Sequence, residues 1–483
     1  MPPDRAYDVI VVGGGAAGCV VAARLAERAS RSVLLVEAGP DRRARPPDGF
    51  RDGWSITREC DWGFSSNADE RGSLARLWRT KLVGGTSWLT RFAVRGSADF
   101  DADALPWFTK LETDVDFGHE PWHGSSGPMP VDRYVHLDFT DVAAAGLDAC
   151  SAIGFPRVED HNAPGGVGAG RMPMSTRDGM RVTTADAYLP VGSTPPNLEI
   201  LADTQVAMVL VDGTRARGVR TTDGREIEAA WVVLSAGTYC SPGVLMRSGI
   251  GPSAHLAAHG IAVCVDLPGV GRNLADHPAV SIECEYLGGD TRQAPILHAI
   301  ATFQSADTPT GAGPDLMLWL ADPEEAPGEP TVFAIDAVLL KPESRGTVRL
   351  RSADPTAPPE VELPGLRTSR DVDRMVEACL RAHAVMSEPG VRRLCGALVP
   401  LDVSTLRDSM RAERYSLPHV VGTCAMGMTP ERGAVVDANG HVHGIEALSV
   451  VDASIIADPP SGFPHLVTIM LAERIAANLD THV

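Results

Sequence analysis

Short runs of β-branched and aliphatic residues, broken by Gly, Pro and Asp, dominate the hydrophobic pattern of this chain. The first run is Tyr7–Val12, which ends directly in the glycine-rich stretch Gly13–Gly18. Val20–Arg28 is then Ala-rich with a helical period, and the apolar run Ser32–Val36 ends at Glu37. The pattern predicts a strand, a tight turn, a helix and a second strand, in that order.

Later in the chain the pattern predicts two kinds of sheet. Val232–Ala236 is a continuous apolar run, typical of a buried parallel strand, and Asn197–Leu201 is also strand-like. Further segments alternate or run apolar between Pro, Gly and Asp breaks, which favours an antiparallel sheet. These segments are Pro278–Leu287, Pro314–Leu320, Pro330–Leu340 and Gly346–Ser352. With a helix predicted over Val467–Asn478, the fold class is α/β (α+β).

The stretch Gly13–Gly18 has the GxGxxG spacing of a dinucleotide-binding turn. Gly13 permits the tight turn, Gly15 lets the backbone approach a pyrophosphate, and Gly18 lets helix and strand pack closely. Glu37 stands where an acid accepts hydrogen bonds from an adenosine ribose, which favours FAD or NAD over NADP. A plain Gly-rich turn is the alternative, but the flanking strand and helix favour the dinucleotide.

Gly165–Gly170 also matches the motif loosely. No predicted strand precedes it and no helical pattern follows it. We interpret it as a surface loop, so the chain is expected to bind one dinucleotide.

Length and charge narrow the function further. With 483 residues and no long linker or repeat, two domains that share the chain are expected. The formal net charge of −19 argues against binding to nucleic acid, which requires a cationic surface. A small-molecule partner is expected instead.

The cysteines and the apolar runs indicate the cellular compartment in which the protein is expected. The 9 cysteines contain no CxxC pair and no zinc-like spacing, which indicates a reduced, cytoplasmic protein without a metal site. There is no signal-peptide pattern and no uncharged apolar run of about 18 residues, so no transmembrane segment is predicted. The pattern leaves the oligomeric state open.

Several longer blocks carry a family resemblance. Lys81–Ser87 with Val94–Gly96 resembles the first signature of the glucose-methanol-choline (GMC) flavoprotein oxidoreductases, and Val232–Gly251 resembles the second. His419–Gly427 and Leu448–Ser454 resemble the family's C-terminal blocks. The resemblance extends from one end of the chain to the other.

The resemblance implies two domains and a cofactor. A Rossmann-type FAD-binding domain of mixed α/β layers is expected from 1–125, 195–276 and 420–483. A substrate domain, with an antiparallel sheet flanked by helices, is expected from 126–194 and 277–419. The implied FAD contacts are Gly13, Gly15, Ala16, Ala17, Gly18, Glu37, Ala38, Gly84, Gly85, Thr86, Ser87, Val206, Ala236, Gly237, Asp452, Ala453, His465, Leu466 and Val467.

The resemblance also implies a catalytic pair, His419 and His465. Alcohol oxidation by a flavin needs a hydride acceptor, flavin N(5), and a group that takes the hydroxyl proton, a role that suits histidine. With 14 histidines in the chain, a structural role for either one is the alternative. We expect His419 to be the base and His465 to orient the hydroxyl. His255 and His259 are expected on an exposed helix.

The chain departs from the family in three places. Covalent members attach FAD through a histidine just after the Gly-Gly-Ser block, where this chain has Trp88 and Leu89, so non-covalent FAD is expected. The asparagine often found near Thr90 is missing. The segment between Asp101 and Leu105 is short, which predicts an open active-site mouth or one closed by another subunit. Aromatic candidates for pocket lining or core packing are Trp88, Phe92, Trp107 and Trp122.

The implied function is oxidation of an alcohol to an aldehyde or ketone, with FAD reoxidised by O₂ or by a quinone or other electron acceptor. Two different classes remain open. Hydroxynitrile lyases share the fold and a histidine pair but perform no net redox chemistry, and fatty-acid photodecarboxylases use the flavin's excited state.

Overall fold

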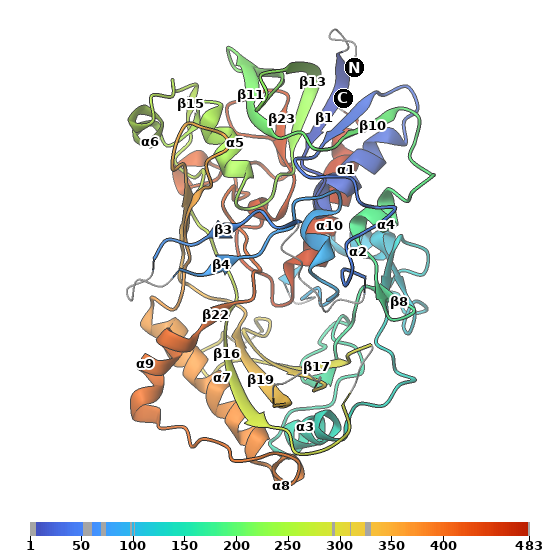
Figure 1. Cartoon of the computed structure of the whole chain (residues 1–483), viewed down its shortest axis with the longest axis vertical. Coiled ribbons are helices and arrows are strands. Elements are labelled where there is room, and N and C mark those ends of the chain that lie inside the picture. The colour runs from blue at the N-terminus through green and yellow to red at the C-terminus, as the bar shows by residue number, and fades with distance from the viewer. Residues whose placement is uncertain are drawn as a thin grey trace.

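The computed structural model describes residues 6–51, 60–68, 74–96, 99–100, 102–291, 295–309, 311–323 and 330–481. Asp101, at the edge of the short segment noted above, lies outside these ranges. Figure 1 shows two layered units along the long axis, with both chain ends at the top. Within the described ranges, no helix is both long and apolar enough to cross a membrane.

The upper unit is built on a mixed sheet whose central strands run parallel. Strand order is β10-β2-β1-β13-β12-β11, and β23 also pairs with β13. The strands are β1 (Tyr7–Val12), β2 (Val33–Val36), β10 (Leu198–Leu201), β11 (Val206–Asp212), β12 (Arg215–Thr221), β13 (Glu226–Leu234) and β23 (Leu448–Val450). Four segments predicted to be strands here are confirmed: three as β1, β2 and the end of β13, and Asn197–Leu201 as β10. β1, β2 and the end of β13 are almost entirely apolar because all of their residues except Asp8 are buried.

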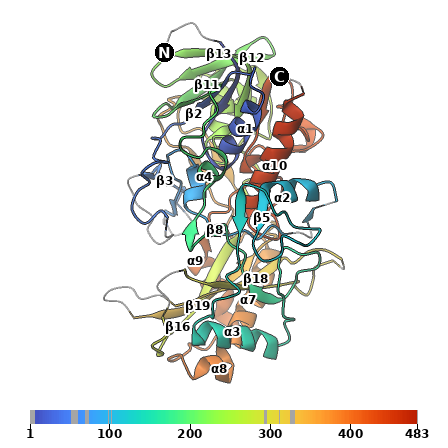
Figure 2. The same ribbon diagram turned by 90° about the vertical axis from the view of Figure 1, so that its right-hand side faces the viewer.

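Two helices from opposite ends of the chain cover this sheet. The helix α1 (Ala16–Ala26) starts directly after Gly15, and α10 (Pro464–Leu479) packs beside it, as Figures 1 and 2 show. Both helices begin earlier than their apolar periods predicted. The N-terminal turn of each is therefore formed by the motif residues themselves.

The lower unit contains a 6-stranded antiparallel sheet of order β22-β16-β19-β18-β17-β7. Its strands are β7 (Ala169–Arg171), β16 (Pro278–Glu285), β17 (His298–Phe303), β18 (Leu316–Ala321), β19 (Val332–Leu339) and β22 (Tyr415–Ser416). Helices cover one face, as Figure 2 shows. The helices on the sheet are α3 (Asp141–Ala152) and α7 (Ser369–Ser387). Helix α8 (Pro389–Arg392) packs against both of them, and α9 (Val403–Glu413) packs against α7. The predicted antiparallel sheet with flanking helices is confirmed.

The other face of this sheet meets residues of the upper unit. Ile300, Met317 and Val338 form a buried cluster with Val94 and Phe463. Their sequence neighbours point to the opposite face, among the residues that pack against α7. The strands are apolar on both faces because each face is covered.

The remaining elements are short. The helices are α2 (Leu105–Leu111), α4 (Thr184–Tyr188), α5 (Ser241–Arg247) and α6 (Ser253–Ala258), with 3-10 turns at Gly85–Trp88, Pro430–Arg432 and Ala453–Ile455. Paired strands are β3 (Phe64–Ser65) with β4 (Arg76–Leu77), β5 (Glu112–Asp114) with β6 (Met129–Val131), β8 (Thr176–Arg177) with β9 (Met180–Arg181), β14 (Ile250–Gly251) with β15 (Val265–Asp266), and β20 (Thr347–Arg349) with β21 (Glu360–Glu362).

Three details differ from the sequence predictions. Gly346–Ser352 contributes β20, which pairs only with β21 and is not part of the 6-stranded sheet. Gly165–Gly170 is not all surface loop, because Ala169 and Gly170 are buried in β7. His255 is half-buried, and its Nε2 accepts a hydrogen bond from the Leu350 backbone N–H at 3.1 Å.

The predicted domain limits remain a proposal. The limit at residue 125 falls between β5 and β6, which are paired strands.

A buried carboxylate connects α10 to its neighbours. Glu473 is fully buried, and its oxygens accept hydrogen bonds from Arg24 at 2.6–2.9 Å and from the Tyr188 hydroxyl at 2.8 Å. Lys110 lies 2.9 Å away. Burial raises the pKa of Glu473, but the hydrogen bonds from Arg24 outweigh it and leave the pKa below its ordinary value. The ionised carboxylate therefore ties α10 to α1, α2 and α4.

We expect Glu473→Ala to lower the free energy of unfolding by about 3 kcal/mol, because removing one partner leaves the others uncompensated. The thermal unfolding midpoint measures the loss. Glu226→Ala is the matched control, since the exposed Glu226–Arg220 pair on the upper sheet should contribute little. Equal midpoints for the two variants would contradict this account of α10.

Candidate active site

A single cavity of about 850 Å³ connects the two units. It runs from the glycine turn after β1 to Trp319 of β18 and Tyr415 of β22. Most of the predicted cofactor contacts line it. They are Gly13, Gly15, Ala16, Ala17, Glu37, Ala38, Gly85, Thr86, Ser87, Val206, Ala236, Gly237, Asp452, Ala453 and His465.

The glycines of the first motif have different reasons for lacking a side chain. A Cβ at Gly18 would lie 1.8 Å from the carbonyl oxygen of Gly13, and one at Gly13 would lie 2.5 Å from that of Ser235. These two positions are therefore required by the packing of the protein itself. At Gly15 the nearest atom to an added Cβ is 3.9 Å away, and Gly15 lines the cavity. The free space above Gly15 fits a ligand that approaches the backbone.

The second glycine block packs against the first. A Cβ at Gly85 would lie 2.6 Å from the Gly15 Cα, and Gly84 donates its N–H to the Gly14 carbonyl at 2.7 Å. Gly84 does not line the cavity, so its role is to support the turn. The Ser87 hydroxyl is also used internally, because it donates to the Gly84 carbonyl at 2.6 Å.

Two carboxylates line the cavity, and both accept hydrogen bonds from the protein. The oxygens of Glu37 accept the N–H groups of Gly14 and Gly39, each at 2.7 Å. Asp452 accepts the Gly237 N–H at 2.9 Å and the Ser241 hydroxyl at 2.6 Å. Asp452 thereby fixes the loop after β13 against the segment after β23. Each Glu37 oxygen retains the capacity for a further hydrogen bond.

Helix α10 presents its first turn at this site. Its N-cap residue, Phe463, provides no side-chain hydrogen bond to the first N–H groups, and Pro464 has no N–H. The side chains of Leu466 and Val467 are buried in the core rather than in the cavity. The predicted contribution of these two residues is therefore restricted to their backbone N–H groups, which suit the polar edge of a bound ligand.

Both predicted histidines line the cavity. His465 is 8% exposed, and its Nε2 is buried with no hydrogen-bond partner among the described residues. Burial lowers the pKa of His465 to about 4. Burial and the neighbouring His277 hold the pKa of His419 well below its ordinary value. Both imidazoles are therefore neutral at neutral pH.

A third histidine, which the sequence analysis missed, contacts the first. His277 is fully buried just before β16, and its Nδ1 lies 3.1 Å from Nδ1 of His419. Asp276 holds the two segments together, since its Oδ1 accepts the backbone N–H of His277 at 2.9 Å and of His419 at 2.8 Å. The only sequence signal for His277 was its place directly before a predicted strand.

Aromatic rings form one wall of the cavity. Phe92 stacks edge-on against Trp319, with ring centroids 4.8 Å apart, and Phe463 lies 5.6 Å from Phe92. Of the four aromatic candidates from the sequence, only Phe92 lines the cavity. Trp88 is fully buried in a small cluster with Phe50. The other two, Trp107 and Trp122, are also absent from the lining.

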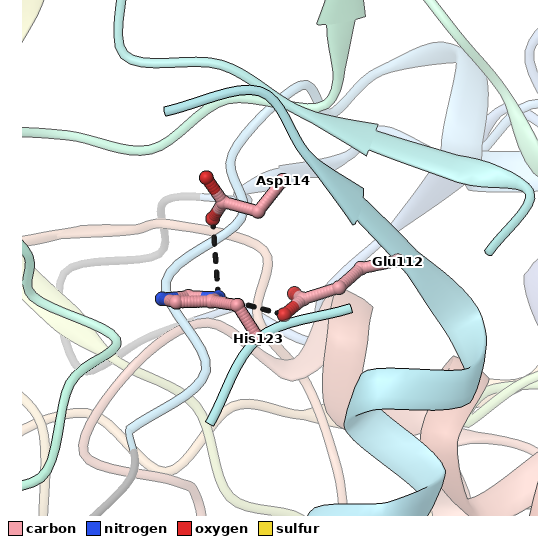
Figure 3. Close-up of side chains that lie close together, drawn as sticks. All are labelled: Glu112, Asp114 and His123. Carbon is pink, nitrogen blue, oxygen red and sulfur yellow. Dashed lines mark hydrogen bonds and ion pairs between the residues drawn. The ribbon is translucent and has the colours of Figure 1, made fainter. Parts of the chain in front are cut away.

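A cluster of residues whose side chains could bind a metal ion lies outside the cavity lining, and Figure 3 shows it. Glu112, Asp114 and His123 form the one such group of three in the described ranges, and all three are buried. Burial lowers the pKa of His123, but hydrogen bonds to Asp160 and Glu112 outweigh it and raise the pKa to about 9. Arg133 donates to Asp114 at 2.9 Å and to Asp160 at 2.7 Å, and Arg95 lies 3.2 Å from Glu112. These cations balance the carboxylates, so the group is a structural ion network.

The chain matches the two family models described as GMC oxidoreductase, over residues 7–279 and 342–472. These matches cover most of its length, and the chain therefore belongs to the GMC oxidoreductases. Membership assigns FAD as the cofactor and oxidation of alcohols as the class of activity.

Individual relatives are similar over almost their whole length. The chain is 32% identical to 5-(hydroxymethyl)furfural oxidase from Methylovorus sp. (strain MP688), over 98% of each chain. It is 34% identical to choline oxidase from Arthrobacter globiformis, over 98% of this chain and 94% of the relative. Pyridoxine 4-oxidase from Mesorbium loti superimposes with a TM-score of 0.89 at 28% identity, covering 99% of this chain and 100% of that chain.

The residues of this cavity fit FAD. The open space at Gly15, the uncapped start of α10 and the unpartnered Nε2 of His465 all belong to the same cavity. The first suits a pyrophosphate, and the second suits the hydrogen-bonding edge of a flavin.

We expect Gly15→Ala and Gly18→Ala to fail in different ways. At Gly15 the added methyl group fits the protein, so the chain should fold normally but retain little FAD. At Gly18 the methyl group collides with the backbone, so the thermal midpoint should fall as well. Flavin absorbance per protein chain and thermal unfolding of the FAD-free form separate the two effects. Full FAD content in Gly15→Ala would contradict the proposal that FAD approaches the backbone at Gly15.

Proposed function

We propose that this protein oxidises an uncharged alcohol to an aldehyde or ketone, with His419 as the general base and His465 as the residue that orients the hydroxyl. The observation that supports this most is that two neutral imidazoles line the same cavity as Gly13 and Gly15 of the dinucleotide-binding turn. FAD, when bound, supplies the hydride acceptor.

The two imidazoles differ in what surrounds them, and this difference supports separate roles. A general base must be neutral and within hydrogen-bond reach of the proton that it takes. Nδ1 of His419 is engaged with His277, which leaves the other ring nitrogen to face a substrate. Nε2 of His465 has no partner in the described structure and can hydrogen-bond the same oxygen. His419 then takes the proton while His465 fixes the oxygen.

We also propose that FAD is held without a covalent bond. Trp88 stands where covalent relatives have their histidine, and its Nε1 donates to the Val83 carbonyl at 2.9 Å. Leu89 lines the cavity but has no nucleophilic atom.

The charges of the cavity support an uncharged substrate. Glu37 and Asp452 are the only carboxylates among the described lining residues, and both are held by protein donors. Arg79 and Lys81 line the same cavity and would repel a cation. The wall of Phe92, Trp319 and Phe463 suits an apolar or aromatic alcohol of modest size.

The proposal also covers the electron acceptor and the location of the protein. The relatives named above are oxidases by name, which supports O₂ as the acceptor, with a quinone or other carrier as the alternative. All 9 cysteines are free, which supports a cytoplasmic location. We propose no oligomeric state.

Anaerobic mixing with an alcohol tests the proposed roles. Wild-type enzyme should lose its flavin absorbance, and His419→Ala should do so about 10²–10⁴-fold more slowly, the usual contribution of acid–base catalysis. Because the pKa values of both histidines are lowered, protonation should slow the wild-type reaction only well below the ordinary histidine pKa of about 6.5.

His119→Ala is the control variant, because the side chain of His119 is 72% exposed. It should reduce flavin at the wild-type rate. A His419→Ala variant that also did so would contradict the base assignment. Release of cyanide from a cyanohydrin with the flavin unchanged would indicate a lyase instead.

A substrate comparison tests the charge argument. Benzyl alcohol should bleach the flavin under anaerobic conditions, and choline should do so at least tenfold more slowly at equal concentration, a difference of about 1.4 kcal/mol. Arg79→Gln should narrow the gap, since it removes one positive charge from the cavity. Faster bleaching by choline would overturn the proposed substrate class.

A further inference from the structure

The contact between His277 and His419 is built into the fold. The rings meet edge to face at 87°, with centroids 5.2 Å apart. One carboxylate, Asp276, accepts the backbone N–H of both residues, and the hydroxyl of Ser416 also donates to it. Both segments are thereby fixed on either side of the imidazole pair. Such a contact constrains the hydrogens on the two rings.

Each neutral imidazole has one N–H and one nitrogen that accepts. The 3.1 Å distance between the two Nδ1 atoms is a hydrogen bond only when one of them is protonated and the other is not. If His277 donated, His419 would carry its own proton on Nε2 and would have no lone pair to take a hydroxyl proton. If His419 donates, its Nε2 is an acceptor.

The surroundings of His277 favour the second arrangement. The backbone carbonyls of Leu340 and Pro460 interact with His277 and stabilise a proton on its ring. Nδ1 of His277 is occupied by the contact with His419, so a proton that these carbonyls favour is carried on Nε2, which is buried and has no partner within hydrogen-bond distance among the described residues. His277 Nδ1 is then left as an acceptor.

The charged groups around the pair keep both rings neutral. Lys341 is close to His277, and Arg79 is close to His419, and each disfavours a second positive charge. The carboxylate of Asp276 is occupied by backbone and hydroxyl donors rather than by either ring. A neutral pair with one shared hydrogen is therefore the arrangement that the charges support.

We infer that His277 is a positioning residue, which accepts the Nδ1–H of His419 and holds His419 in the tautomer whose Nε2 can take a proton. When His419 takes that proton, its Nδ1–H becomes a stronger donor, and the hydrogen bond to His277 helps to stabilise the imidazolium. The kinetic part of this inference rests on the proposed function of His419.

Two variants of the holoenzyme test the inference. His277→Asn retains an acceptor oxygen near the position of Nδ1, whereas His277→Leu has similar bulk and no acceptor. ¹⁵N NMR of histidine-labelled protein reads the tautomer directly, with the His419 signals assigned by their loss in His419→Gln. We expect the wild type and His277→Asn to show a protonated Nδ1 and an unprotonated Nε2 on His419. His277→Leu should lose this preference.

Anaerobic flavin reduction gives the second readout. We expect His277→Leu to be slower by about 100-fold, at the low end of the range for acid–base catalysis, with its FAD content unchanged. His277→Asn should recover most of the rate. A wild-type rate in His277→Leu, or a His419 that carries its proton on Nε2 in the wild type, would overturn the inference.

The two proposals fail in distinguishable ways. If His419→Ala reduces flavin normally, the assigned base is wrong, but the NMR result still decides whether His277 fixes the tautomer. If His277→Leu binds no FAD, His277→Asn keeps the inference testable.

Discussion

The carboxylate of Asp276 holds together the two segments on which the active site depends. By accepting the backbone N–H of His277 and of His419, it joins chain positions 142 residues apart at the point where the lower sheet begins. Burial raises its pKa to about 6, so keeping the charge costs free energy that the hydrogen bonds must offset. The buried carboxylate of Asp276 therefore serves to hold the backbone of His277 and of His419 in place.

The same principle recurs around the cavity. Asp452 joins the loop after β13 to the segment after β23. Glu473 ties α10, whose first turn contains His465, to three other helices. Lys341 forms a further link, because it lies 2.8 Å from Asp99, whose carboxylate also accepts the Ser461 hydroxyl. Segments that are distant in sequence are thus held around the cavity by carboxylates, of which Asp276, Asp452 and Glu473 are buried. The imidazoles can then be placed firmly without being charged themselves.

The features that could be predicted from the sequence are those carried by short contiguous motifs. The strand, glycine turn and helix at the N-terminus, and the blocks that contain His419 and His465, are contiguous stretches whose spacing reflects their geometry. His277 escaped notice because its role arises from a contact across the fold and no local pattern marks it. Of the aromatic wall, Trp319 and Phe463 were missed for the same reason, since they approach Phe92 only after the two units meet. Strand Thr347–Arg349 was assigned to the wrong sheet because apolar alternation predicts a strand but does not identify its partner.

The proposed function requires that both His419 and His465 reach the oxygen of the alcohol. A crystal structure of the FAD-bound enzyme, grown anaerobically with benzyl alcohol, measures this most directly. We predict that the alcohol oxygen lies within hydrogen-bond distance of both imidazoles, at about 2.6–3.2 Å from each. An alcohol oxygen bound to a different group, with either imidazole out of reach, would contradict the account.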